Sequence, residues 1–265
     1  MTKIAVIAGE GDLAPAVVAA LDTPAVYALA GLKPQVAAEE FRLERLIPFL
    51  DKLSADGISD VVFAGAIRRP RLEPELFDPR TMTLVPRILS AMQTGDDAAL
   101  REVLAVFEES GLNIRSVSEI APSLVPGDGL LVGTASEADI RDTAEAARIV
   151  HELGKLDIGQ GAVVAQGLCL AVEALPGTDA MLEFVREHNG LRPNAKGARG
   201  VIYKAPKPGQ DRRIDLPTVG PDTVRHAAAA DLAGIAWEAG GIILLERERT
   251  IAEAQKNGLF LWSRA

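Results

Sequence analysis

The sequence has one cysteine, few aromatic residues and no long apolar run. A single cysteine, Cys169, excludes an internal disulfide and is typical of proteins from a reducing compartment. No stretch reaches the ~20 apolar residues of a membrane-spanning helix, and the N-terminal apolar run is too short for a signal sequence. Because aromatic residues make up only 4% of the chain, the core must consist mainly of Ala, Val, Leu and Ile. We therefore expect a cytoplasmic protein.

An excess of basic charge is also missing. The net charge is −9, which argues against a nucleic-acid partner, since such partners favour a basic face. The basic residues nevertheless cluster, first at 68–71 and again between 196 and 213. Local cationic clusters on an acidic chain indicate a small anionic ligand rather than a polymer.

The order of apolar patterns predicts an α/β protein with two domains. In the first half, apolar runs alternate with helical faces, which indicates a Rossmann-like parallel sheet covered by helices. We expect strands at Lys3–Ala8, Ala25–Ala30, Asp60–Ala64 and Asn113–Val117, and helices at Leu13–Leu21 and Phe41–Leu53. The irregular segment 118–136, rich in Pro and Gly, favours a boundary that gives an N-terminal domain of 1–132 and a C-terminal domain of 133–265.

The second half predicts a mixed α/β domain. Ser136 and Asp139 form a capping box for a helix that Gly154 is expected to end. Gln166-Gly167 separates two apolar runs, as in a β-hairpin, and the second run, which contains Cys169, is interpreted as a buried strand. Further strands are expected at Gly200–Tyr203, Gly234–Trp237 and Ile242–Leu245, with helices at Thr178–His188 and Pro221–Leu232.

The N-terminal segment IAGEGDLAP joins a predicted strand to a predicted helix. Gly9 and Gly11 allow close backbone approach, so the helix amides there are a candidate anion site. As a dinucleotide fingerprint the segment is incomplete, because Ala14 stands at the third glycine position and Asp22 comes too early for the ribose-binding acid. A tight turn without a ligand is the alternative.

The segment GAIRRPRLEP follows the predicted strand Asp60–Ala64. Residues at the carboxyl ends of parallel strands line ligand crevices, and the planar donor fork of arginine suits phosphate. Arg68 and Arg69 are therefore candidate phosphate ligands, with a solvated loop as the equally weighted alternative.

Three loop motifs of the second half combine acids, cations, Gly and Pro. They lie at 156–160, 172–181 and 204–223. Pyrophosphate hydrolysis needs cations against the developing charge, a site for Mg²⁺ and a carboxylate that orients water. Asp211 and Asp215 flank Arg213 at two-residue intervals, which in an extended segment would place all three on one face. A structural ion-pair network remains the alternative.

These strings resemble those of one family. G-A-I-R-R-P, D-I-G-Q, V-E-A-x-x-G-T-D-A-M and K-P-G-Q-D-R-R-I-D-L-P-T-V-G-P are similar to the LpxI pyrophosphatases of lipid A biosynthesis, and the likeness runs nearly end to end. Glu10 and Ala14 depart from the usual opening turn. The resemblance implies an Mg²⁺-dependent enzyme that converts UDP-2,3-diacylglucosamine to 2,3-diacylglucosamine 1-phosphate (lipid X) and UMP. It also implies transient peripheral contact with the inner membrane, and a homodimer is compatible with it.

The matched motifs give the candidate site residues. The catalytic candidates are Asp215, Asp211, Glu173 and Arg213, and the candidate Mg²⁺ ligands are Asp215, Asp211 and Asp179. The substrate-binding candidates are Gly9, Gly11, Asp12, Leu13, Arg68, Arg69, Gln160, Gly177, Thr178, Asp179, Lys204, Lys207, Gln210 and Thr218. Two other functions stay open, namely a dinucleotide-dependent oxidoreductase and a non-catalytic protein that binds a nucleotide sugar or lipid.

Overall fold

The computed structural model describes residues 3–67, 71–94 and 96–265. These residues form two units, Met1–Pro122 and Ser123–Ala265. The division falls about ten residues before the predicted boundary, because strand β6 (Gly129–Val132) pairs antiparallel with the last strand, β13 (Phe260–Arg264). The segment between the two predicted domains therefore supplies an edge strand to the second unit.

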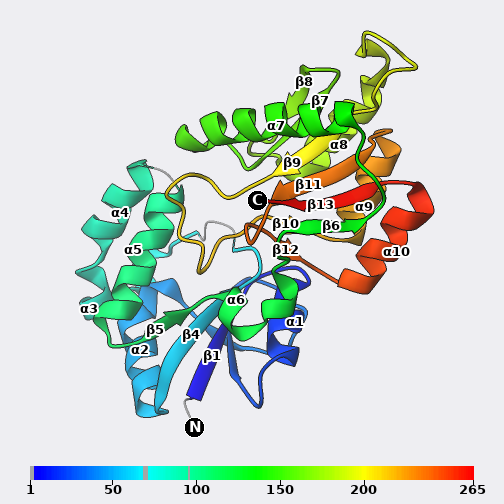
Figure 1. The fold of residues 1–265 in the computed structure, drawn as a ribbon. Helices are drawn as coiled ribbons and strands as arrows, with labels where there is room; N and C mark the ends of the chain where they lie inside the picture. Colours follow the sequence, from blue (N-terminus) through cyan, green and yellow to red (C-terminus); the bar gives the residue numbers. More distant parts are fainter. Residues whose placement is uncertain (1–2, 68–70, 95) are drawn as a thin grey trace. The chain divides into compact units, whose positions relative to one another are not determined.

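The first unit contains the predicted parallel sheet, which has five strands (Figure 1). Four of them lie at the predicted apolar runs, whereas the fifth, Glu39–Phe41, is not an apolar run and is not among the predicted strands. The order of the sheet is β3-β2-β1-β4-β5, which makes β1 the central strand. The strands are β1 (Lys3–Ala8), β2 (Ala25–Leu29), β3 (Glu39–Phe41), β4 (Ile58–Ala64) and β5 (Asn113–Arg115). Strands buried on both faces by crossover helices need apolar side chains at nearly every position, and this explains the unbroken runs in β1 and β4.

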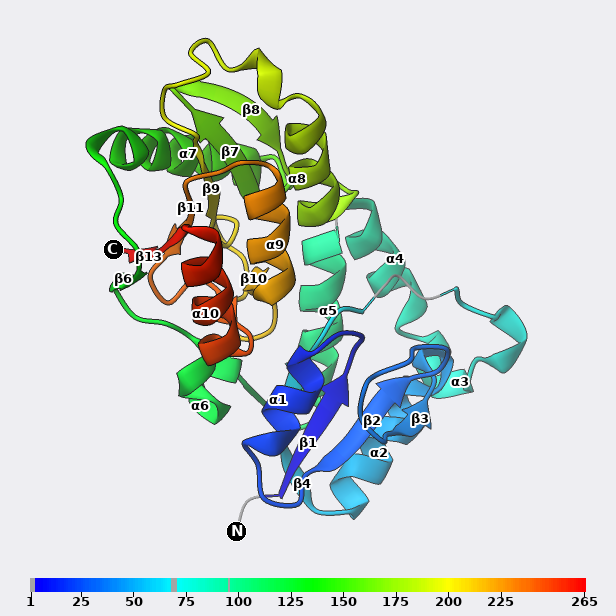
Figure 2. The ribbon, with the colours of Figure 1, turned by 90° about the vertical axis from the view of Figure 1, so that its right-hand side faces the viewer.

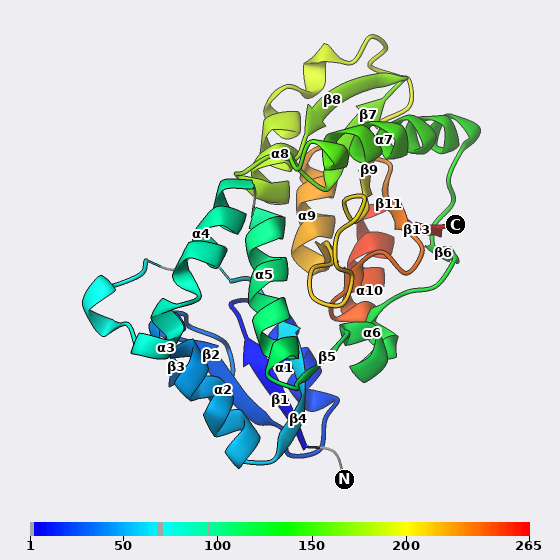
Figure 3. The same cartoon turned by 90° about the vertical axis from the view of Figure 1, so that its left-hand side faces the viewer.

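Helices connect and cover these strands. They are α1 (Leu13–Ala19), α2 (Leu46–Ala55), α3 (Pro79–Met82), α4 (Val85–Thr94), α5 (Asp96–Glu109) and α6 (Val117–Ile120), with 3₁₀ turns η1 (Leu43–Arg45), η2 (Pro74–Leu76) and η3 (Pro122–Leu124). α4 and α5 lie side by side (Figure 3), joined by an ion pair between Arg87 Nη2 and Glu109 Oε1 at 2.6 Å. The helix predicted from Phe41 begins later, because Phe41 ends β3 and stacks on Phe49 at 4.1 Å between ring centroids.

The second unit contains a six-stranded mixed sheet of order β6-β13-β11-β9-β7-β8 and a two-stranded sheet of β10 and β12. Its remaining strands are β7 (Gly161–Ala165), β8 (Leu168–Val172), β9 (Val201–Lys204), β10 (Thr218–Val219), β11 (Gly234–Glu238) and β12 (Ile243–Leu244). The helices are α7 (Glu137–Lys155), α8 (Gly177–Glu187), α9 (Pro221–Ala229) and α10 (Arg247–Asn257), with a 3₁₀ turn η4 (Asn189–Leu191). The predicted mixed α/β domain is confirmed.

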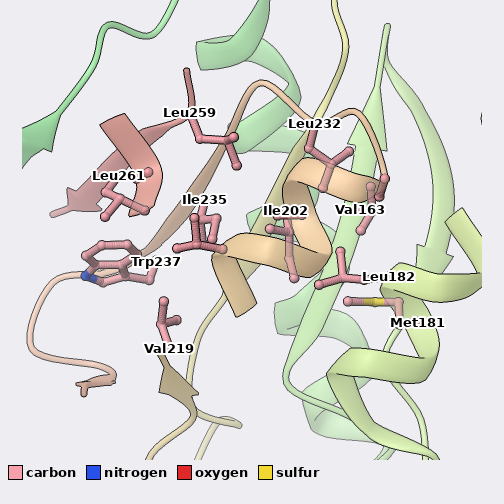
Figure 4. Close-up of a cluster of buried hydrophobic side chains, with 14 of the residues drawn as sticks. Val163, Met181, Leu182, Ile202, Val219, Leu232, Ile235, Trp237, Leu259 and Leu261 are labelled. Carbon is pink, nitrogen blue, oxygen red and sulfur yellow. The ribbon is translucent and has the colours of Figure 1, made fainter. Parts of the chain in front are cut away.

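The two faces of this sheet bury different helices. Figure 2 shows α8, α9 and α10 on one face, where Val163, Ile202, Ile235 and the fully buried Trp237 pack with residues of these helices. Figure 4 shows this cluster, with Met181 and Leu182 from α8. On the opposite face, the alternate strand residues pack against α7. The core thus follows the two-residue period of the strands.

Two local predictions are confirmed around α7 and the β7–β8 hairpin. Ser136 accepts a hydrogen bond from the Asp139 amide at 3.3 Å, and Asp139 accepts one from the Ser136 amide at 2.9 Å, which is the expected capping box. Gln166 and Gly167 both have positive φ, as a two-residue type I′ hairpin turn requires. The buried Asp142 of α7 fixes this turn, because it accepts hydrogen bonds from both turn amides.

Strand β8 corrects the prediction of a buried strand. It is the edge strand of its sheet, Leu168 is 50% exposed, and the thiol of Cys169 is exposed. The prediction was wrong because an edge strand can have the same apolar residues as a central strand, so the apolar run alone does not show that the strand is buried. No described helix is both long and apolar enough to cross a membrane.

Candidate functional site

The motifs of the second half converge on one edge of the six-stranded sheet. Strands β8 and β9 both run antiparallel to β7, so their carboxyl ends lie at the same edge as the amino end of β7. The segments 157–160, 173–179 and 205–217 therefore begin or end at this edge. Two backbone hydrogen bonds join them, from Glu173 N to Gly161 O at 2.8 Å and from Ala205 N to Gln160 O at 3.1 Å.

Lys204, at the end of β9, is buried with two polar partners. Its ammonium donates to Thr178 Oγ1 at 2.5 Å and lies 3.6 Å from Glu173 Oε2. Thr178 in turn donates to Glu173 Oε1 at 3.0 Å. A buried ammonium is costly unless a charge compensates it, so Glu173 has a clear electrostatic role here.

The same geometry limits what Glu173 can touch. Its Oε2 is buried and has no hydrogen-bond partner among the described residues, and a Cβ at Gly161 would lie only 2.6 Å from it. The carboxylate is thus enclosed against backbone. This arrangement favours compensation of Lys204 over the direct catalytic role predicted from the sequence.

The loop 205–217, between β9 and β10, carries the other acids. The prediction of an extended segment with Asp211, Arg213 and Asp215 on one face is wrong, because the chain turns here. Ile214 N and Asp215 N both donate to the carbonyl of Asp211 at 3.3 Å. Arg213 folds back on Asp211, and its Nη2 reaches Oδ2 at 2.6 Å.

Asp215 is held by Gln210, which is only 8% exposed. Gln210 Nε2 donates to Asp215 Oδ2. On its other side, Gln210 Oε1 accepts from Gln160 Nε2 at 2.9 Å and from Lys207 N at 2.8 Å. Two of the residues predicted to bind substrate, Gln160 and Gln210, therefore contact each other, and Gln210 also contacts Asp215.

Ion pairs tie this loop to neighbouring elements. Lys207 Nζ pairs with Asp157 Oδ1, beyond α7, and Arg212 Nη2 pairs with Glu238 Oε1 of β11 at 2.7 Å. Tyr203 lies on the face of β9 opposite to Lys204, and burial raises the pKa of its phenol to about 12, so the phenol stays protonated at neutral pH.

Three further candidate residues of the second unit are not in contact with the loop 205–217 through any hydrogen bond described above. Asp179 Oδ1 contacts His226 Nδ1 of α9 at 2.9 Å. Thr218 lies in β10 and is paired with Ile243 of β12. Gly177 has a φ of +86° and begins α8, next to Thr178.

The first unit presents the turn after β1. β1 and β4 are neighbours at the centre of the sheet, where the chain order reverses, and such switch points are where open α/β sheets bind ligands. Gly9 and Gly65 are packed back to back, since a Cβ at Gly9 would lie 2.5 Å from the carbonyl carbon of Gly65. Gly11, Asp12 and Leu13 follow directly and open α1. Arg68 and Arg69 lie outside the described residues.

The described residues hold no group of three or more His, Cys, Asp or Glu side chains placed to bind a metal ion. Mg²⁺ does not need one, because it keeps several waters and takes one or two protein carboxylates together with phosphate oxygens. Both oxygens of Asp211 already accept hydrogen bonds from Arg213. The carboxylate oxygens of this loop, on Asp211 and Asp215, are of the donor type that Mg²⁺ takes.

Two family models match this chain along almost its whole length. Residues 3–124 match the LpxI N-terminal domain, and residues 128–262 match the LpxI C-terminal domain. The chain belongs to the LpxI family. It is 44% identical over 212 residues to the UDP-2,3-diacylglucosamine pyrophosphatase LpxI of Caulobacter vibrioides, a match that covers 79% of this chain and 75% of the relative. The two LpxI domain models meet between 124 and 128, close to the division of the structure at Pro122.

Sequence reasoning missed the role of Gly154 in this LpxI protein. Helix α7 continues through Gly154 to Lys155, and the left-handed residue that follows the helix is Asp157, with φ 55°. Gly154 instead makes room for the loop, because a Cβ there would lie 2.6 Å from Pro208 Cδ and 3.2 Å from Lys207 Cα. A glycine near the end of a predicted helix is typical of a helix stop, but glycine is also needed where another segment packs closely against the helix backbone, as at Gly154.

We expect Gly154→Ala to displace the loop at Lys207 and Pro208. A proline ring is fixed to the backbone, so it cannot rotate away from the added methyl group as a flexible side chain would. Hydrogen exchange should become faster at the Lys207 amide, whose bond to Gln210 depends on this position. Gly190→Ala is the control, since nothing lies within 4 Å of its added Cβ. Equal protection of Lys207 in both variants would show that the loop does not depend on Gly154.

Proposed function

We propose that this chain hydrolyses the pyrophosphate bond of UDP-2,3-diacylglucosamine, giving 2,3-diacylglucosamine 1-phosphate (lipid X) and UMP. The observation that carries the proposal is membership of the LpxI family across both units, with a relative named for this activity. The converging loops of the second unit add acids and cations of the kind that the chemistry needs. The pathway is lipid A biosynthesis.

Asp215 is the residue that we assign to the reaction itself. It is half-buried, and Gln210 fixes one of its oxygens. A carboxylate held in this way can orient a water molecule toward phosphorus or bind a cation without first reorganising. A bound Mg²⁺, held by Asp215 with Asp211 beside it, would neutralise charge on the phosphate oxygens.

The cations have separate tasks in this proposal. Lys204 is buried at the end of β9, where its charge is fixed by Glu173 and Thr178. Arg213 is 40% exposed while bound to Asp211, so it can exchange part of this contact for a substrate phosphate. Separately, we propose that the turn at Gly9–Leu13 in the first unit binds an anionic group.

The proposal is tested with purified protein and UDP-2,3-diacylglucosamine, with Mg²⁺ and with Mg²⁺ plus excess chelator. We expect equimolar UMP and lipid X, detected by ³¹P NMR, and loss of both products with chelator. Binding without products would support the non-catalytic alternative, and turnover only with an added nicotinamide cofactor would support the oxidoreductase. Either result would overturn the proposal.

We also propose reversible contact with a membrane surface and association of two copies. The substrate carries two acyl chains, and the first unit exposes Met82 and Leu89 beside a small apolar pocket lined by Leu43, Phe77 and other residues. Such a patch gives weak association, since stable anchoring takes more than one signal.

The exposed edge of β8 would suit pairing with a second copy. Flotation with liposomes and light scattering test these two proposals.

A further inference from the structure

The hydrogen bonds of Gln210 determine which way its amide group points. Its Oε1 lies 2.9 Å from Gln160 Nε2 and 2.8 Å from the backbone nitrogen of Lys207, and both of these atoms are donors. The atom that faces them must be the oxygen. The amide NH₂ group is therefore on the other side, where it donates to Asp215 Oδ2.

The partners of Gln210 are themselves fixed. Lys207 is paired with Asp157. Gln160 directly precedes β7, and its backbone carbonyl accepts a hydrogen bond from Ala205 N at 3.1 Å. Gln210 is only 8% exposed, so it has little freedom to find other partners.

We propose that Gln210, held by Gln160, is a positioning residue that fixes the direction of the Asp215 carboxylate. A glutamine suits this task because it donates to the carboxylate without carrying a charge that would neutralise it, and hydrogen bonds to an ionised acceptor are the strong ones. The inference rests on the proposed function for the role of Asp215. It differs from the expectation that Gln160 and Gln210 bind substrate, because Gln160 Nε2 and both polar atoms of the Gln210 amide have partners within the protein.

Kinetics of Gln210→Met and Gln210→Glu test the inference. Methionine keeps the length but removes donor and acceptor, whereas glutamate keeps the acceptor for Lys207 N and replaces the donor to Asp215 with a second carboxylate. We expect both variants to lower kcat by at least about tenfold, because small misplacements of a catalytic group have effects of up to about 100-fold. KM should change by less than about threefold, since the substrate contacts are unchanged.

Three comparisons exclude a merely structural role. In a protein that already carries Asp215→Asn, adding Gln210→Met should cause no further loss of kcat, because residues that act as a unit are not additive. Gln160→Met should lower kcat less than Gln210→Met, since Lys207 N still holds Gln210. Gln255→Met, an exposed glutamine of α10, is the matched control and should keep wild-type kinetics. A wild-type kcat in Gln210→Met, or a rise in KM alone, would overturn the inference.

Side-chain amide signals in ¹⁵N–¹H NMR spectra provide a readout that does not need activity. Asp215→Ala should shift the signals of Gln210 and Gln160, while Asp222→Asn, an exposed acid of α9, should leave them in place. Unmoved Gln210 signals in Asp215→Ala would overturn the inference even if the wild type proved inactive. Conversely, shifted signals in an inactive wild type would support the contact and refute the proposed function, so the two failures are distinguishable.

Discussion

Asp215→Asn should lower kcat by about 10²- to 10⁴-fold, the range that a positioned acid or base contributes. Asparagine keeps an oxygen that can accept the hydrogen bond of Gln210, so the fold of the loop should persist while the charge is lost. A carboxylate that binds Mg²⁺ or orients water acts mainly on the transition state, so KM should change little. Single-turnover kinetics with UDP-2,3-diacylglucosamine measure the effect.

The companion variant Asp215→Ala separates chemistry from stability. We expect it to fold, to bind the lipid and to turn over slowly enough for substrate to survive purification. Asp222→Asn is the control, because Asp222 is 71% exposed and pairs with Arg225 on the surface of α9. If Asp215→Ala lost melting temperature and kept a wild-type rate, Asp215 would only stabilise the turn.

Glu173→Ala should destabilise the second unit by about 3–5 kcal/mol, the cost of removing one partner from a buried ion pair. The side chains of Lys204 and Glu173 are only 5% and 14% exposed, so water cannot replace the lost carboxylate well. Urea unfolding followed by tryptophan fluorescence measures the change, since Trp237 and Trp262 both lie in this unit.

Two further variants make this result specific. Glu183→Ala removes one partner of the exposed pair with Arg186 and should destabilise the protein far less, because water replaces the lost contact. Glu173→Ala combined with Lys204→Met should recover much of the lost stability, because no buried charge remains. A loss below about 1 kcal/mol in Glu173→Ala would mean that Lys204 does not depend on Glu173.

The sequence by itself determined the local structure. Unbroken apolar runs such as Lys3–Ala8 predicted the parallel sheet, and the positive φ of Gln166 and Gly167 follows from the hairpin between two apolar runs. The capping box at Ser136 was also predicted, since it requires only residues three apart. These features depend on backbone dihedrals and burial periods, which neighbouring residues encode.

Only the tertiary structure decided which loops meet and what each acid contacts. Lys204 is 31 positions from Glu173, and Gln160 is 50 positions from Gln210, yet the strand order brings each pair together. The same applies to Gly154, whose missing side chain accommodates Pro208. Contacts across such distances are set by the register and order of strands, because the one-dimensional pattern of a loop contains charges but not the partners that will face them.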